Sequence, residues 1–155
     1  MRGWWRRRWT ELARLARRAV REASSPRELA LSVGLGVLVG ASPLVGLHSV
    51  VALGAASALR LNRVGAFLGS NVSFGPIVVG LVWAEVRLGC AALGVAPLAG
   101  DDALALARSH LAAWWLGYAL LGPLLASLSA ALTWAAASAW QRRVSSASGR
   151  TSAPG

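Results

Sequence analysis

Few side chains in this sequence could act as acids, bases or nucleophiles. Among its 155 residues are six carboxylates, two histidines, one cysteine and one tyrosine. His48 and His110 are 62 positions apart and neither has a carboxylate beside it, so we interpret each as a hydrogen-bonded structural or interfacial histidine. The lone Cys90 excludes an intramolecular disulfide and a thiol-based metal site. The sequence therefore predicts no enzyme, no catalytic residue, no metal site and no cofactor.

Glu85 and Arg87 are the most informative charged pair, because apolar residues surround them. Two positions apart on a helix, they point to different sides and are not expected to pair with each other. Ionisable groups inside a membrane domain tend to face a cavity or a partner. The alternative is that both lie at the membrane boundary, where charge costs little. The sequence leaves these two placements open.

The composition indicates a single-domain membrane protein. Hydrophobic residues make up 55% of the chain, charged residues only 14%, and the mean hydropathy is +0.53. Soluble domains carry about 25% charged residues. The net charge of +10 is compatible with nucleic-acid binding, but nine of the sixteen arginines lie between Arg2 and Arg27. Because bacterial membrane proteins fix their orientation with positive charge beside apolar spans, we expect no nucleic-acid partner.

The N-terminal segment, residues 1–25, is predicted to contain a basic amphipathic helix over residues 4–23. At 100° per residue its tryptophans and alanines share one face and most of its arginines the other. Such helices lie in the headgroup region and bind anionic lipids; the alternative is packing on a partner protein. Pro26 then ends the segment. The residues expected at the membrane interface are Trp5, Trp9, Arg6, Arg7, Arg14, Arg17, Arg18 and Arg21.

The first apolar run, residues 29–59, contains 31 residues without a formal charge. One straight helix of that length would measure ~46 Å, against a hydrocarbon core of ~30 Å, whereas two full crossings need ~40 residues. Glycines and Pro43 interrupt the middle of the run. We therefore predict a re-entrant hairpin broken near Ser42-Pro43. It would return Arg60 and Arg63 to the cytoplasmic side, where the N-terminus lies.

Two further apolar runs complete a membrane domain predicted over residues 26–143. The run from Val64 to Ala84 is interrupted at residues 71–76, and residues 109–141 contain one tilted or kinked span from about Leu111 to Trp134. Tryptophans near the two ends of that span fit an interfacial belt. The arginines at 142–143 are expected on the same side as the N-terminus. Residues 144–155, rich in Ser, Ala, Gly and Pro, are predicted to be a disordered tail.

A weak internal echo links the first two runs. Gly36 and Gly40 are followed by Pro43, and Gly65 and Gly69 are followed by Pro76. Small residues at this spacing allow helices to approach closely in lipid. Paired segments interrupted by Gly and Pro also point to the binding site in some transporters, although seventeen glycines can produce such an echo by chance.

Three short elements resemble a bacterial membrane family catalogued as domain of unknown function 2062. They are residues 42–48 (SPLVGLH), 60–63 (RLNR) and 69–73 (GSNVS), followed by Leu88-Gly89. The resemblance covers about residues 26–143. Relatives often have a Pro-Pro pair where this chain has Gly75-Pro76, so the second break is expected to be softer. The family's domain is sometimes fused to family-2 glycosyltransferases, which implies work on envelope or lipid-linked glycans by association.

These observations predict an all-α integral protein of the bacterial inner membrane, multi-pass and with a cytoplasmic N-terminus. The leading hypothesis is transport or handling of a lipid-linked or anionic lipid, because helix ends exposed by the two breaks attract anions such as phosphates. The alternative is a non-catalytic anchor or accessory subunit, for example of a glycosyltransferase, and a homo-oligomer is also possible. The expected partners are the bilayer, anionic lipids and a lipid-linked sugar. The candidate substrate-binding residues are Pro43, Gly46, His48, Asn62, Asn71, Ser73 and Pro76.

Overall fold

The computed structural model describes residues 11, 14–15, 17–20, 23, 25–44, 46–71, 76–96 and 110–148. Every regular element in these ranges is a helix, which confirms the predicted all-α class. The N-terminal helical residues 11, 14–15 and 17–20 precede five longer helices. These are α2 (Pro26–Ala41), α3 (His48–Ala58), α4 (Arg63–Ser70), α5 (Pro76–Leu93) and α7 (Leu111–Ser148). Of the predicted interface residues, Trp5, Trp9, Arg6, Arg7 and Arg21 lie outside the described residues.

The first apolar run folds as a broken hairpin, with its break at the predicted place. The hydroxyl of Ser25 accepts a hydrogen bond from the backbone N–H of Glu28 at 3.1 Å and begins α2. Helix α2 ends at Ala41, directly before the predicted Ser42-Pro43 break. Gly46, with a φ of +85°, lies in the turn that leads to α3. Both halves are therefore shorter than a membrane crossing.

A tight turn joins α3 to α4. The backbone N–H of Leu61 donates to the carbonyl of Ala56 at 2.8 Å, and Arg60 has a φ of +55°. This is a Schellman cap, in which glycine is the usual residue at the position of Arg60. Asn62 then begins α4, because its Oδ1 accepts from the backbone N–H of Gly65 at 2.8 Å.

The two glycine motifs pack against each other. A Cβ built on Gly36 would lie 2.8 Å from the Cα of Gly69, and one on Gly40 would lie 2.8 Å from the Cα of Ser70. The absence of side chains at these positions lets α2 and α4 touch through their backbones. The internal echo in the sequence thus describes the contact between two neighbouring helices.

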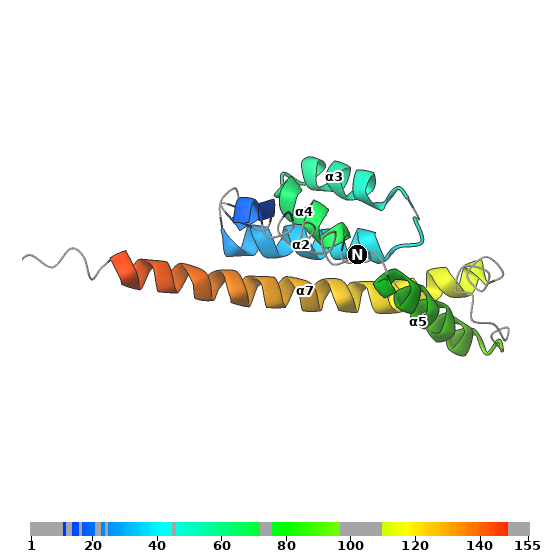
Figure 1. The fold of residues 1–155 in the computed structure, drawn as a ribbon. Coiled ribbons are helices and arrows are strands. Elements are labelled where there is room, and N and C mark those ends of the chain that lie inside the picture. Colours follow the sequence, from blue (N-terminus) through cyan, green and yellow to red (C-terminus); the bar gives the residue numbers. More distant parts are fainter. Residues whose placement is uncertain are drawn as a thin grey trace, which may run out of the picture.

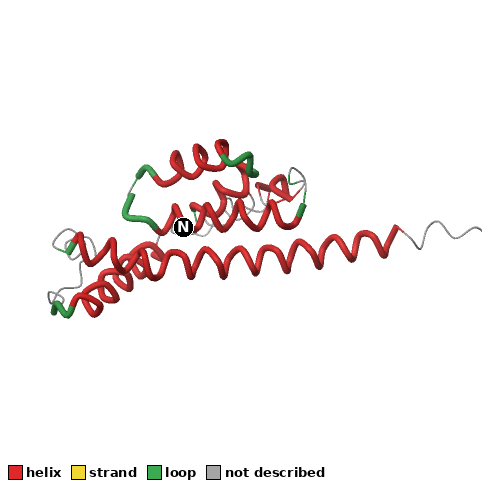
Figure 2. The backbone as a smooth tube through the Cα atoms, turned by 180° about the vertical axis from the view of Figure 1, so that it is seen from behind, coloured by secondary structure: helices red, strands yellow, loops and turns green. Residues whose placement is uncertain are grey.

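Helix α7 is the longest element, and α2 and α5 both pack against it (Figure 1). Its 38 residues correspond to ~57 Å. Helix α2 lies antiparallel on its C-terminal part, where Gly34 meets Ala126 and Ala130. Helix α5 lies antiparallel on its N-terminal part, where Gly89 meets Ala113. Figure 2 shows from behind that α3 and α4 lie on the far side of α2 from α7.

The predicted boundary of the C-terminal tail is corrected by the length of α7. Residues 144–148, expected to be disordered, continue the helix to Ser148. The hydroxyls of Ser145 and Ser146 donate to the carbonyls of Gln141 and Arg143, each at 3.0 Å. These serines therefore bond within the helix and do not end it. Residues 149–155 lie outside the described part of the chain.

Candidate functional site

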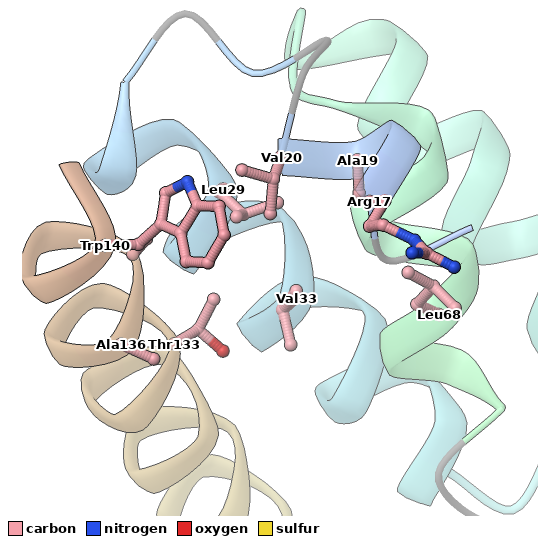
Figure 3. A pocket seen from close by; sticks show the side chains of 10 residues that line it. Arg17, Ala19, Val20, Leu29, Val33, Leu68, Thr133, Ala136 and Trp140 are labelled. Carbon is pink, nitrogen blue, oxygen red and sulfur yellow. The ribbon is translucent and has the colours of Figure 1, made fainter. Parts of the chain in front are cut away.

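A cavity of about 510 Å³ lies between the N-terminal helical residues, α2, α4 and the C-terminal part of α7. Figure 3 shows Trp140 of α7 facing Val20 and Leu29, with Arg17 and Leu68 at the opposite side. All but two of the lining residues are apolar. They are Arg17, Ala19, Val20, Leu29, Val33, Leu68, Thr133, Ala136, Ala137 and Trp140.

The walls of this cavity offer little hydrogen bonding to a ligand. The hydroxyl of Thr133 already donates to the carbonyl of Ser129 at 2.7 Å. Arg17 is the single charged lining residue, and its side chain is exposed. The cavity therefore offers a ligand mainly apolar contact, together with one positively charged side chain.

Asn62 holds the N-terminal wall of the cavity in place. Its side-chain amide donates to the carbonyl of Ala19 at 3.1 Å, while its backbone N–H donates to the hydroxyl of Ser32 at 2.9 Å. Only 7% of Asn62 is exposed and only 2% of Ala19. One asparagine thus connects the N-terminal helical residues, α2 and the start of α4.

Arginines gather at this end of the molecule. Arg17 lines the cavity together with residues at the start of α2 and with Trp140, which lies two residues before Arg142-Arg143. The hydrogen bond from Asn62 to Ala19 brings Arg60 and Arg63 to the same end. Of the arginines in the described ranges, Arg87 on α5 is the exception (Figure 1). The fold therefore collects arginines from four separate parts of the sequence.

The predicted substrate-binding residues fall at two different places. Pro43, Gly46 and His48 lie in or directly after the turn between α2 and α3, and Asn71 follows α4. Because Gly40 meets Ser70, this turn and the end of α4 lie at the same end of the α2–α4 pair, whereas Asn62 lies at the other end. Ser73 and the side chain of Pro76 are outside the described residues.

Polar side chains beside the two breaks bond to their own helices. The amide of Asn71 donates to the carbonyl of Phe67 at 2.8 Å, as does the hydroxyl of Ser70 at 2.9 Å. The hydroxyl of Ser42 donates to the carbonyl of Val39 at 2.6 Å. Such bonds satisfy backbone acceptors at helix ends. The proposed role of Asn71 in binding a ligand stays a prediction.

The sequence analysis did not find the cavity walls on α2 and α7. Leu29 and Val33 are spaced at i and i+4, and Thr133, Ala136 and Trp140 at i, i+3 and i+7, so each set lies on one helix face. The spacing is visible in the sequence. Nothing in it shows that these two faces diverge and leave a space, because that depends on where Gly34 lets the helices meet.

The predicted lack of pairing between Glu85 and Arg87 is confirmed. The guanidinium of Arg87 lies over the ring of Trp83, 4.6 Å from its centroid. Glu85 is fully buried, and its Oε2 accepts a hydrogen bond from the indole N–H of Trp114 at 2.8 Å. The carboxyl therefore lies inside the protein, between α5 and α7, and not at a surface boundary.

Within the described residues, one helix is long and apolar enough to cross a membrane. It is the part of α7 from Leu111 to Arg143, and only 6% of its apolar window is buried inside the protein. The core helix of a soluble protein would be mostly buried. By length and composition this gives weak support for a membrane protein.

A family model for an uncharacterised protein conserved in bacteria matches residues 9–145. Neither the curated proteins nor the solved structures give a match. The matched segment includes all five helices almost to the end of α7, and it extends beyond the three motifs noted in the sequence. The chain therefore belongs to the bacterial family of domain of unknown function 2062.

Proposed function

We propose that this protein is an integral protein of the bacterial inner membrane that binds and handles an anionic lipid. The single observation that carries the proposal is the apolar cavity at the arginine-rich end, with Arg17 at its edge. An acyl or prenyl chain would occupy the cavity, and its phosphate would lie near the arginines. A lipid-linked sugar has this same chemistry, an apolar chain joined to an anionic group.

Exposed apolar surface supports the membrane location. Leu120, Leu124, Leu128 and Leu132 form an i, i+4 ridge along α7, each with 51–63% of its surface exposed. On α5, Ile77 and Val79 are likewise more than half exposed. A water-soluble monomer rarely exposes contiguous apolar surface of this extent, whereas hydrocarbon solvates it.

The arrangement of the arginines supports a cytoplasmic position for both ends of the chain. In this topology α2 and α3 enter the membrane and return, α4 and α5 cross it in two pieces, and α7 crosses back. Arg60, Arg63 and Arg142 would then share the cytoplasmic side with the N-terminal arginines. The two breaks would lie at membrane depth, where irregular backbone must be enclosed by protein or face a cavity.

A second function remains as the alternative outcome, that of an accessory subunit which anchors a partner enzyme. The exposed apolar residues of α5, including Trp83 and Leu88, would suit a partner helix as well as lipid. In that case the cavity would have no ligand of its own. Lipid retention by the purified protein separates the two functions.

The test is native mass spectrometry of the detergent-purified protein after mixing with phosphatidylglycerol or phosphatidylcholine. We expect Ala136→Phe, which fills the cavity, to lower retained lipid at least tenfold. Ala135→Phe is the matched control, because Ala135 is exposed on the same helix and does not line the cavity. Equal retention by the two variants would refute the proposed site.

The charge at the edge of the cavity is tested separately. Arg17→Gln should weaken phosphatidylglycerol retention about fivefold, because one basic residue contributes on the order of 1 kcal/mol near an anionic headgroup. Phosphatidylcholine retention should not change. Arg14→Gln is the control, since Arg14 is exposed on the same segment and does not line the cavity.

A further inference from the structure

Glu85 is buried, and one of its two carboxyl oxygens lacks a hydrogen-bond partner among the described residues. None of its surface is exposed, and Oε2 accepts the indole N–H of Trp114 at 2.8 Å. Its Oε1 is also buried and has no hydrogen-bond partner among the residues that the structure describes. Buried polar atoms in folded proteins almost always have a partner, so an orphaned carboxyl oxygen calls for an explanation.

Helices α5 and α7 approach each other so closely beside this carboxyl that their backbones touch. A Cβ built on Gly117 would overlap the backbone carbonyl of Glu85, and one on Gly89 would overlap that of Ala113. The adjoining buried cluster consists of Val86, Cys90, Ala113 and Trp114. The backbones of α5 and α7 therefore touch at these glycines, and protein atoms enclose the carboxyl.

No cation compensates the carboxyl among the described residues. On α5, Arg87 lies over Trp83, and Cys90 is the nearest other ionisable group. On α7, Tyr118 lies one turn after Trp114, and His110 lies one turn before it. An ionised carboxylate without a counter-charge is very costly in such surroundings, whereas the neutral acid needs few hydrogen bonds.

We propose that Glu85 is a proton-binding site, and that loss of its proton to water opens the α5–α7 contact. With the proton bound, the neutral acid can stay buried, and α5 and α7 stay in contact. With the proton released, the carboxylate recovers its hydration only when α5 moves away from α7. Nothing in this inference depends on which ligand, if any, occupies the cavity at the arginine-rich end.

The direction of the pH effect follows from which state prefers the proton. The closed contact favours the protonated acid, and the open contact exposes an ordinary carboxyl that ionises near pH ~4.3. The carboxyl therefore stabilises the closed contact fully below pH ~4.3, and this stabilisation is lost as the pH rises above that value. Because opening releases one proton, the opening equilibrium can increase by up to about tenfold per pH unit.

The native Cys90 reports on the contact without any engineered label. It is fully buried in the cluster that contains Trp114, the hydrogen-bond partner of Glu85, and it is the chain's one cysteine. We would measure its rate of reaction with a small methanethiosulfonate reagent from pH 5 to pH 8 on the full chain in nanodiscs. Glu85→Gln is the comparison, because an amide oxygen can still accept the N–H of Trp114 and cannot ionise.

The ratio of the two rates isolates the carboxyl. The comparison removes the pH effects that do not involve the carboxyl. We expect the wild-type rate to exceed that of Glu85→Gln by at least tenfold at pH 8 and by a much smaller factor at pH 5. Parallel pH profiles would overturn the proposal and leave Glu85 with a packing role.

Infrared spectroscopy of the wild type provides a second measurement in case Glu85→Gln does not fold. At pH 6 exposed carboxyls are ionised, so a protonated carboxyl band should come from a buried acid. We expect this band to be present at pH 6 and to disappear as Cys90 becomes reactive. Absence of the band at pH 6 would contradict the proposal whatever the variant does.

Discussion

The α2–α4 pair and the α5–α7 contact use their buried polar side chains in different ways. The hydroxyl of Ser32 donates to Glu28 and accepts the backbone N–H of Asn62. The side chain of Asn62 bonds Ala19 and Gly65, and Ser70 bonds its own helix, so these buried groups are satisfied. Glu85 in the α5–α7 contact leaves one oxygen without a partner. Both contacts depend on glycines that let backbones touch. The difference indicates that the first contact is built for stability and that the second carries a group that can change state.

The largest effect should come from filling a glycine contact in the α2–α4 pair. A side chain at Gly36 would overlap the carbonyl of Ala66, which is backbone and cannot move aside. We expect Gly36→Leu to cost more than ~3 kcal/mol, at or above the upper end of overpacking, and to abolish the monodisperse protein in detergent size-exclusion chromatography. Gly54→Leu is the control, because nothing lies near that position. Normal behaviour of Gly36→Leu would show that the two helices do not touch there.

The next largest effect should come from Asn62, a buried polar residue of the α2–α4 pair whose hydrogen bonds are satisfied. Asn62→Ala removes the cap of α4, leaves the N–H of Gly65 without that acceptor and removes the bond to Ala19, whose carbonyl still accepts the N–H of Ala23. We expect a loss of about 2–3 kcal/mol in unfolding free energy, measured by chemical denaturation in detergent. Trypsin should also cleave after Arg17 faster. Asn71→Ala, which loses one bond to Phe67, should cost less than 1 kcal/mol, roughly one ordinary hydrogen bond.

Replacing Glu85 in the α5–α7 contact should have the opposite effect, because it should not destabilise the protein. Glu85→Gln should change stability little at pH 5 and raise it above the wild type at pH 8 by on the order of 1 kcal/mol or more, because the variant has no charge to bury. Thermal unfolding at the two pH values measures this. If Glu85→Gln destabilised the protein equally at both, the two regions would not differ in the way we infer.

The smallest effect is expected at the C-terminal caps of α3 and α5. Both end in a Schellman motif, but Gly94 takes the left-handed position in α5 (φ +67°), whereas Arg60 takes it in α3 (φ +55°). Arg60→Gly should stabilise the fold by about 1 kcal/mol, and Gly94→Ala should destabilise it by about the same amount. Arg60→Gly should also remove one positive charge from the arginine-rich end. Differential scanning fluorimetry resolves such shifts when both variants are measured together.

Much of the fold was predictable from local signals in the sequence. Pro26, Pro43 and Pro76 mark a helix start or break because proline lacks an N–H and fixes its φ angle. The uncharged run from residue 109 predicted one tilted or kinked span from about Leu111 to Trp134, and α7 covers that span as one helix that continues through Pro123. The tail was misjudged because residues 144–148 have a composition typical of loops but continue an established helix, where adding each residue costs little.

The candidate site depended on tertiary structure. By itself the sequence determined the helices, their breaks, the arginine clusters and the family, because each depends on neighbouring residues or on short motifs. It could not determine that the two glycine motifs face each other, that Asn62 reaches Ala19 across 43 positions, or that Leu29 and Trp140 bound one cavity. Those facts depend on the helix crossings, which backbone contacts at a few glycines decide and residue spacing does not. The same holds for Glu85, whose burial became visible only when α5 lay against α7.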